Sequence, residues 1–240
     1  MCGIIGVASG RANFVTKDLL KKMTDVIAHR GPDGEGHWVS EKGNIGFGHR
    51  RLSIIDLSEK ASQPMHYLDK YVLIYNGEIY NYLELKETLL KQGYNFNTAS
   101  DTEVLLAMYD KHKESCLNLL DGMFAFAIYD KEKNTLFCAR DRFGEKPFYY
   151  AFNKRKDFYF ASEMKALKTA DVSNSINENA LYNYISYGQV RNQHNNASTF
   201  YDNYLQLEPA HYLLLDVTSL SLTKTKYYQL NPLINIDKNN

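Results

Sequence analysis

The sequence predicts an α+β fold with mostly antiparallel sheets whose strands are buried on both faces. Two stretches indicate buried strands: the apolar run at residues 3–7 and the stretch 45–57, whose apolar residues fall on both strand faces. A succession of short strands separated by turn residues, from 123 to 161, indicates an antiparallel meander. The composition agrees, because 44% hydrophobic and 23% charged residues among 240 are an ordinary globular balance with a sizeable core.

Helical periodicity separates these strands. Thr16 is a suitable cap for the first helix, and Gly31 with Pro32 stops it. Ser100 followed by Glu103 forms a capping box that opens a later helix. The other helical segments are expected at residues 79–92, 113–120, 163–168 and 177–187, in addition to the first at 16–30.

The remaining strands follow from short apolar or alternating runs between turn formers. Asn76-Gly77 is a strong turn signal directly after one of them. The polar region 189–205 predicts a surface loop, and residues 231–240 predict a mobile tail. The strands are expected at residues 38–39, 71–75, 123–129, 135–140, 147–152, 157–161, 211–216 and 222–229.

Charge and cysteine content exclude several classes of protein. Lysine plus arginine equals aspartate plus glutamate, at 28 each, which argues against nucleic-acid binding. No apolar run approaches the roughly 18 residues of a membrane span, and the N-terminus lacks a signal-peptide pattern. Three scattered cysteines predict a reducing cytoplasm, with Cys116 and Cys138 as core residues. The histidines lack paired metal-ligand spacing, so no metal is expected.

Cys2 stands directly behind the initiator methionine, which is commonly removed when the next residue is small. Removal would leave a terminal cysteine whose α-amino group, titrating at about 7.7–8.0, can accept the thiol proton. The thiolate is the attacking species, and an adjacent base activates it. From these residues alone, a catalytic nucleophile and a merely tolerated small residue are equally supported.

Three other stretches place polar groups at predicted strand or helix ends. Arg50 and Arg51 lie on opposite faces of one strand, so one must face inward to bind a carboxylate, or else extend to water from a sheet edge. Asn76 and Gly77 form either a tight turn or a pair of oxyanion donors, a side-chain amide and a backbone N–H. Asp101, in the first helical turn, is explained by the helix dipole without a ligand.

Ten motifs follow one another along the chain, eight specific ones up to about residue 167 and two weaker ones beyond. In this order they resemble the glutaminase domain of asparagine synthetase of the B type, a class II glutamine amidotransferase with an N-terminal nucleophile. The motifs are Met1-Cys-Gly-Ile-Ile-Gly6, His29-Arg-Gly-Pro-Asp-Gly34, Arg51-Leu-Ser-Ile-Ile-Asp56, Tyr75-Asn-Gly-Glu-Ile-Tyr-Asn81, Ser100-Asp-Thr-Glu-Val-Leu105, Gly122-Met-Phe-Ala-Phe-Ala127, Arg140-Asp-Arg-Phe-Gly-Glu-Lys-Pro147, Ala161-Ser-Glu-Met-Lys-Ala166, Leu207-Glu-Pro-Ala-His-Tyr-Leu213 and Tyr227-Tyr-Gln-Leu230.

The resemblance implies the four-layer αββα sandwich of N-terminal nucleophile hydrolases and a role for each candidate residue. By analogy, Cys2 is the nucleophile and its own amino group the base. Arg51 would bind the α-carboxylate of glutamine, and Asp101 its α-ammonium. Asn76 and Gly77 would form the oxyanion hole. The same analogy places further groups in the substrate pocket: Glu78 and the backbone of Leu52, Ser53, Ile54 and Ile55.

The function that the resemblance implies is hydrolysis of L-glutamine to L-glutamate and ammonia through a Cys2 thioester, by a domain spanning residues 1–230. The ammonia would serve asparagine synthesis from aspartate and ATP. Full-length members continue into a synthetase domain with a Ser-Gly-Gly-x-Asp-Ser pyrophosphate loop, but no two glycines are adjacent here. ATP and Mg²⁺ are therefore expected only for that missing domain, no cofactor for this chain, and residues 231–240 as a tail or the start of a linker.

Alternatives stay open at this point. The ammonia acceptor could be another molecule, such as a sugar acid. An amidase of the same fold acting on a different amide would need neither Arg51 nor Asp101, and a non-catalytic regulatory module would not need Cys2. The expected partners are L-glutamine and the synthetase domain or subunit that receives ammonia. A homodimer is left open, and neither nucleic acid nor membrane is expected.

Overall fold

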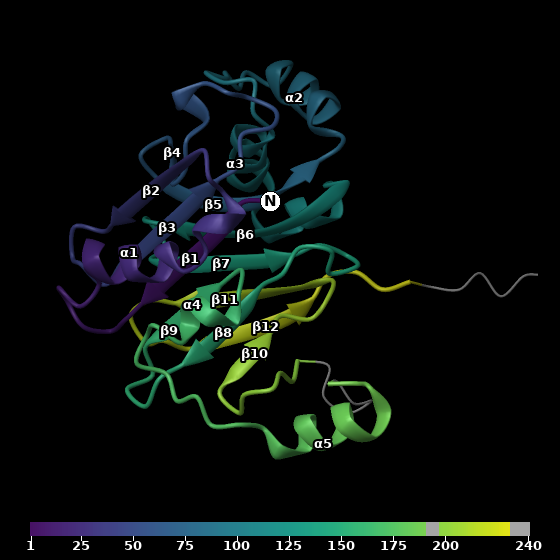
Figure 1. Ribbon diagram of the computed structural model, residues 1–240. Coiled ribbons are helices and arrows are strands. Elements are labelled where there is room, and N and C mark those ends of the chain that lie inside the picture. Colours follow the sequence, from purple (N-terminus) through teal and green to yellow (C-terminus); the bar gives the residue numbers. More distant parts are fainter. Residues whose placement is uncertain (191–196, 231–240) are drawn as a thin grey trace, which may run out of the picture.

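The computed structural model describes residues 1–190 and 197–230, so the expectation for 231–240 lies outside the described residues. Within the described part, the strands form two six-stranded sheets, and every pairing between named strands is antiparallel (Figure 1). Sheet A has the order β10 (Tyr204–Gln206), β8 (Tyr149–Phe152), β9 (Phe158–Ala161), β1 (Gly3–Ala8), β3 (Ile45–Arg51), β2 (Gly34–Val39). Sheet B has the order β12 (Leu222–Lys226), β11 (His211–Asp216), β7 (Thr135–Arg140), β6 (Gly122–Asp130), β5 (Tyr71–Ile79), β4 (Met65–Tyr67).

Helices cover the outer faces of both sheets. Against sheet A pack α1 (Lys17–Asp25) and α4 (Met164–Leu167), and against sheet B packs α3 (Asp101–His112), with α2 (Tyr82–Leu90) beside it. This gives the four layers, helix, sheet, sheet and helix, and confirms the predicted αββα sandwich. The remaining helical segments are α5 (Glu178–Tyr187) and short 3₁₀ helices at Ala28–Arg30, Glu59–Ala61 and Lys113–Asn118.

Alternation along β1 explains why this strand is buried on both faces. Ile4 points between the sheets, where it joins Phe47 of β3 and Ile74 of β5 in one core cluster. Ile5 points the other way and packs in the cluster beneath α1. Because successive side chains of a strand face opposite sides, one apolar strand serves two cores. The predicted core cysteines, Cys116 and Cys138, are buried and unbridged.

The structure corrects several predicted boundaries. The strand predicted at 45–57 ends at Arg51, because the following segment leaves the sheet. Asn76 and Gly77 do not form a turn: they lie inside β5, paired with Ala125 and Phe124. Residues 191–196 of the predicted surface loop 189–205 lie outside the described residues, and its last residues contain the start of β10. Strand β4 was not predicted at all. Both are three-residue strands, too short to show periodicity.

One predicted cap is only half right. Ser100 caps α3 by accepting a hydrogen bond from Thr102 N at 3.1 Å, as expected. Glu103 does not return to the Ser100 N–H. Instead, its carboxylate accepts bonds from the backbone N–H groups of Asn97 and Thr98, at 2.7–3.0 Å, and so organises the loop before the helix. No helix in the described ranges is long and apolar enough to cross a membrane.

Candidate active site

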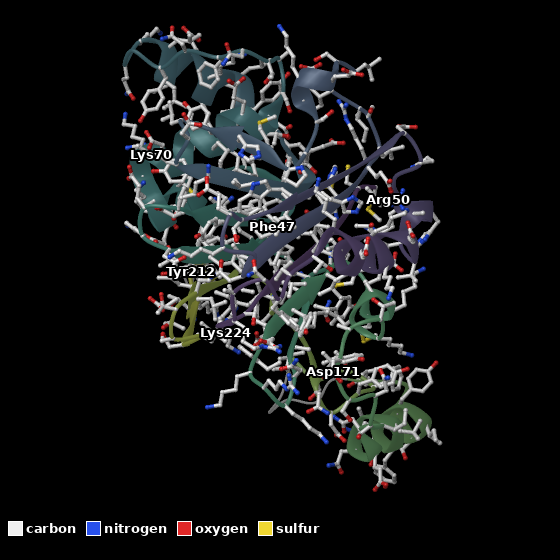
Figure 2. All side chains as sticks on the ribbon, turned by 90° about the vertical axis from the view of Figure 1, so that its left-hand side faces the viewer. Phe47, Arg50, Lys70, Asp171, Tyr212 and Lys224 are labelled. Atoms are coloured by element: carbon white, nitrogen blue, oxygen red, sulfur yellow. The ribbon has the colours of Figure 1, made fainter. Side chains whose placement is uncertain are left out.

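A cavity of about 210 Å³ lies where the end of β3 and the end of β5 meet the start of β1. Phe47, labelled in Figure 2, lies in the core between the sheets, and the cavity begins two residues further along its strand. The antiparallel pairing of β1 with β3 sets the beginning of one strand beside the end of the other. All sequence-predicted site residues line this one cavity: Cys2, Arg51, Leu52, Ser53, Ile54, Ile55, Asn76, Gly77, Glu78 and Asp101.

The Cys2 thiol is held by backbone groups at the cavity wall. Its Sγ lies 3.4 Å from the Leu52 nitrogen, which donates to it, and 3.5 Å from the Leu52 carbonyl, to which the thiol donates. Arg30 Nε donates to the Cys2 carbonyl at 2.9 Å and fixes the main chain. Burial raises the pKa of the Cys2 thiol, against smaller lowering effects from the Leu52 N–H and nearby positive charges. The thiol is therefore protonated at neutral pH, and attack on a substrate requires a base.

Met1 lies beside the thiol and lines the same cavity. Met1 is 55% exposed, and Lys146 Nζ lies 3.4 Å from its sulfur. With Met1 attached, the nitrogen of Cys2 is a peptide nitrogen, which cannot accept a proton. Removing Met1 would create an α-amine on Cys2 and vacate space next to the thiol.

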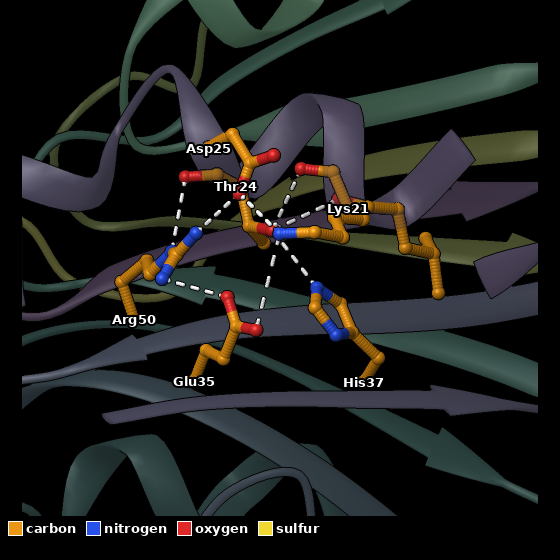
Figure 3. Close-up of polar contacts among 7 residues, drawn as sticks. Lys21, Thr24, Asp25, Glu35, His37 and Arg50 are labelled. Atoms are coloured by element: carbon orange, nitrogen blue, oxygen red, sulfur yellow. Dashed lines mark hydrogen bonds and ion pairs between the residues drawn. The ribbon is translucent and has the colours of Figure 1, made fainter. Parts of the chain in front are cut away.

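The two adjacent arginines of β3 point to opposite faces, and the structure decides which enters the cavity. Arg50 lies on the outer face of sheet A beside α1, at the edge of the molecule in Figure 2. Its guanidinium contacts Asp25 Oδ1 at 2.5 Å and Glu35 Oε2 at 2.7 Å, and its Nε donates to the Thr24 carbonyl at 3.2 Å (Figure 3). Arg51 is consequently the arginine that lines the cavity.

Arg51 is held by neutral oxygens. Its guanidinium donates to the Asp56 carbonyl at 2.5 Å and to Ser62 Oγ at 3.3 Å. Across residues 1–190 and 197–230, it forms no ion pair with a carboxylate. A cation that is positioned by neutral acceptors and faces a cavity is suited to bind an anionic group, and its planar fork matches a carboxylate.

The segment after Arg51 forms one rim of the cavity. Both backbone groups of Leu52 contact the Cys2 sulfur, and the Ser53 N–H donates to Asp33 Oδ2 at 2.8 Å. Ile54 and Ile55 line the opening with exposed side chains. The segment thus positions the thiol through Leu52, while its later residues border the entrance.

Asn76 and Gly77 line the same cavity as Cys2, from strand β5 of sheet B. Asn76 is 1% exposed, and its Nδ2 has no hydrogen-bond partner within the described residues. An unpaired buried donor costs free energy, about 1–3 kcal/mol, unless a ligand completes it. At Gly77 a Cβ atom would collide with the Met123 carbonyl and the Phe124 Cα of the neighbouring strand. The close pairing of β5 with β6 explains why this strand residue is glycine.

Alternation along β5 gives the direction of the Gly77 N–H. The N–H groups of Tyr75 and Ile79 point away from β6, because they donate to Gln63 Oε1 at 2.6 Å and Asp101 Oδ2 at 3.1 Å. Residues two apart on an antiparallel strand direct their N–H groups to the same edge. The Gly77 N–H therefore points to the cavity edge of β5, as a second donor near Asn76 Nδ2.

Asp101 presents a buried carboxylate from the first turn of α3. It is 4% exposed, and its Oδ2 accepts bonds from the Tyr75 hydroxyl at 2.8 Å and from the Ile79 N–H at 3.1 Å. No lysine, arginine or histidine of the described chain forms an ion pair with it. Burial raises the pKa of Asp101 above its ordinary value, partly offset by these hydrogen bonds. A cationic ligand would compensate this charge.

Several cavity residues were missed by sequence reasoning. Tyr75 orients Asp101, and Gln63 accepts from the Tyr75 N–H. His49 precedes Arg51 by two positions, a spacing on one strand face that could have indicated it. Gln63 and Lys146 lie in connecting segments, where no periodicity points to the cavity.

Comparisons with known proteins agree with this geometry. A family model described as a glutamine amidotransferase domain matches residues 1–228. Asparagine synthetase [glutamine-hydrolyzing] 1 of Bacillus subtilis is 49% identical over 191 residues, which are 78% of this chain and 30% of that protein. Asparagine synthetase B [glutamine-hydrolyzing] of Escherichia coli is 42% identical over 171 residues, 70% of this chain and 30% of that protein.

The fold also matches a solved structure. The glutamine phosphoribosylpyrophosphate amidotransferase of Bacillus subtilis superposes with a TM-score of 0.70 at 19% identity, over 95% of this chain and 50% of that one. The chain spans about a third to a half of the length of these relatives. Together with the family match over residues 1–228, the αββα sandwich and the cavity at the N-terminal cysteine show that the chain belongs to the glutamine amidotransferase domain family.

Proposed function

We propose that this chain hydrolyses L-glutamine to L-glutamate and ammonia through a thioester on Cys2. The observation that carries the proposal is one cavity that holds a thiol, a cation and an anion. The cation is the Arg51 guanidinium and the anion is the buried Asp101 carboxylate, and neither forms an ion pair within the described chain. An amino acid with a free α-carboxylate and α-ammonium supplies the complement of both charges. An amidase for uncharged amides would need neither group.

The proposed reaction starts once Met1 has been removed. The α-amine of Cys2 accepts the thiol proton, and the thiolate attacks the side-chain carbonyl carbon of glutamine. The tetrahedral intermediate collapses by breaking the C–N bond. The departing nitrogen takes the proton from the α-ammonium of Cys2, which regenerates the Cys2 amine, and leaves as ammonia. Water then attacks the thioester, the amine accepts its proton, and glutamate departs as the thiol re-forms. This chemistry needs no metal or organic cofactor.

Asn76 Nδ2 and the Gly77 N–H supply the donors for the oxyanion in this scheme. Both lie on β5 beside the cavity, and the first has no partner among the described residues. Donors fixed before the reaction stabilise charge that develops in the transition state, and removing one typically costs on the order of 10²–10³ in turnover.

The test is release of glutamate and ammonia from L-glutamine by the purified chain, compared with Cys2→Ala and with Cys138→Ala. Cys138 is buried between the sheets, outside the cavity, so its variant controls for loss of a cysteine without loss of the nucleophile. Cys2→Ala should abolish release while retaining the folded circular-dichroism spectrum, and Cys138→Ala should retain release. Hydrolysis by Cys2→Ala at a rate near wild type contradicts the proposal.

We further propose that the ammonia serves asparagine formation from aspartate and ATP in a synthetase domain or subunit. Two relatives at 42–49% identity are named glutamine-hydrolysing asparagine synthetases, and this supports the assignment. ATP and Mg²⁺ would bind that synthetase part, and the cytoplasm is the compartment proposed for both. The test adds L-aspartate, ATP and Mg²⁺ to the chain together with a synthetase domain or subunit, and follows the amide ¹⁵N of glutamine into asparagine. Transfer of amide ¹⁵N from glutamine into a product other than asparagine would identify another acceptor.

A further inference from the structure

His49 is a buried histidine whose ring nitrogens have no well-aligned hydrogen-bond partner within the described residues, and the backbone of Tyr75 is a polar neighbour of the ring. It is 1% exposed and lines the cavity. Burial lowers the pKa of His49 to about 3; a hydrogen-bonding contact with the Tyr75 backbone opposes this shift, and the Arg51 charge adds to it. The ring is therefore neutral at physiological pH and offers one N–H donor and one nitrogen acceptor.

The position of His49 follows from alternation along β3. Ile45, Phe47, His49 and Arg51 share one strand face, and the first two belong to the core between the sheets. His49 is the first polar group after that core, and Arg51 follows it in the cavity. Asn76 occupies the corresponding place on β5, two residues after the core residue Ile74. The inter-sheet core thus ends in two polar side chains, one from each sheet, and both retain unsatisfied nitrogen atoms.

Two buried side chains with unpaired nitrogen atoms line one cavity, and such atoms cost free energy unless a ligand pairs with them. A protein with an unpaired buried donor or acceptor is typically less stable than the same protein with an apolar side chain of similar shape at that position. Their cost is recovered when a polar ligand enters. Arg51 and Asp101 match the α-carboxylate and α-ammonium of an amino acid. The part of the ligand left to contact His49 and Asn76 is therefore its side chain, and a neutral polar side chain suits these two residues.

We propose that His49 is a substrate-positioning residue that hydrogen-bonds the side-chain carboxamide of glutamine through the ring nitrogen that does not face the Tyr75 backbone. This inference rests on the glutaminase function proposed above. A carboxamide carries both a donor and an acceptor, and it therefore complements a neutral imidazole. The contact exists in the ground-state complex, so it acts on substrate binding more than on turnover.

The experiment compares His49→Leu, which removes the polar atoms at similar volume, with His49→Gln, which restores an amide donor and acceptor. Ile45→Val is the matched control, because it alters packing on the same strand face outside the cavity. We expect His49→Leu to raise KM for glutamine about 5- to 100-fold, because a buried polar contact is lost, and to change kcat less. His49→Gln should recover most of this loss. The melting temperature should stay unchanged or rise in His49→Leu and fall in Ile45→Val.

A second readout separates this inference from the glutaminase proposal. Calorimetric binding of L-glutamine is measured in a Cys2→Ala background, with and without His49→Leu. Weaker binding with His49→Leu supports the inference even if the wild-type chain hydrolyses no glutamine, a result that would overturn only the proposed function. A wild-type KM and a lowered melting temperature in His49→Leu would show that the ring serves packing alone. Equal KM defects in His49→Gln and His49→Leu would also overturn the inference.

Discussion

Replacing Asp101 with asparagine distinguishes a substrate-binding carboxylate from a residue that only begins a helix. The side-chain oxygen of asparagine can still accept bonds from the Tyr75 hydroxyl and the Ile79 N–H, which lie 2.8 and 3.1 Å from Asp101 Oδ2. Ser100 still caps α3 through Thr102 N. The substitution therefore removes the charge and retains the local geometry.

The effect of Asp101→Asn on stability follows from the direction of the pKa shift. Burial raises the pKa of Asp101, so the folded state holds the proton more tightly than the unfolded chain does. Stability from this group is fully present below the unfolded pKa of about 3.9 and is lost as pH rises through the folded value. At neutral pH, Asp101→Asn should keep or raise the melting temperature. The loss of a carboxylate from a helix dipole would instead cost about 0.3–1 kcal/mol.

The effect on activity should be large and specific to the α-ammonium. Removing one partner of a buried, hydrogen-bonded charge pair costs about 2–5 kcal/mol, or about 30- to 4,000-fold in kcat/KM. The assay measures ammonia release from L-glutamine and from its analogue without the α-amino group. Asp101→Asn should lose activity on glutamine and change little on the analogue.

Two results would refute the reasoning. Equal losses on both compounds would mean that Asp101 does not contact the ammonium. A lower melting temperature, with an unchanged ratio of activity on glutamine to activity on the analogue, would mean that Asp101 only begins the helix. Asp110, further along α3, provides a matched Asp→Asn control, because it accepts bonds from the Tyr71 and Tyr94 hydroxyls outside the cavity.

Three further predictions concern the donors, the terminus and pH. Asn76→Ala should lower kcat on the order of 10²–10³-fold with little change in KM, and steady-state kinetics showing a KM effect alone would contradict an oxyanion role. N-terminal sequencing of active protein should begin at Cys2, and full activity with Met1 retained would require another base. The pKa of His49 is lowered to about 3, so on acidification the unfolded chain binds a proton at this residue at a higher pH than the folded chain does. Stability should therefore fall as pH drops from about 6.5 toward 3. Urea midpoints measured over this range should fall less in His49→Gln than in wild type.

The sequence by itself predicted the classes of element and a set of candidate residues that line one cavity. An apolar run predicted β1, helical periodicity predicted the helices although not their bounds, and the cap at Ser100 needed only neighbouring residues. The motif order supplied the resemblance, and with it Cys2, Arg51 and Asp101 as candidates. These features are readable because each depends on short-range pattern or on residue identity.

Tertiary structure decided what local pattern left open. Asn76-Gly77 reads as a turn in isolation, yet pairing with β6 keeps it in a strand and turns its donors to the cavity. Strand alternation alone does not distinguish Arg50 from Arg51. The packing of α1, with Asp25 and Glu35 beside Arg50, leaves Arg51 in the pocket, as the resemblance had implied. Whether the ring nitrogens of His49 find hydrogen-bond partners depends on which groups the two sheets bring together where they meet. That is a property of long-range packing, which local sequence patterns do not report.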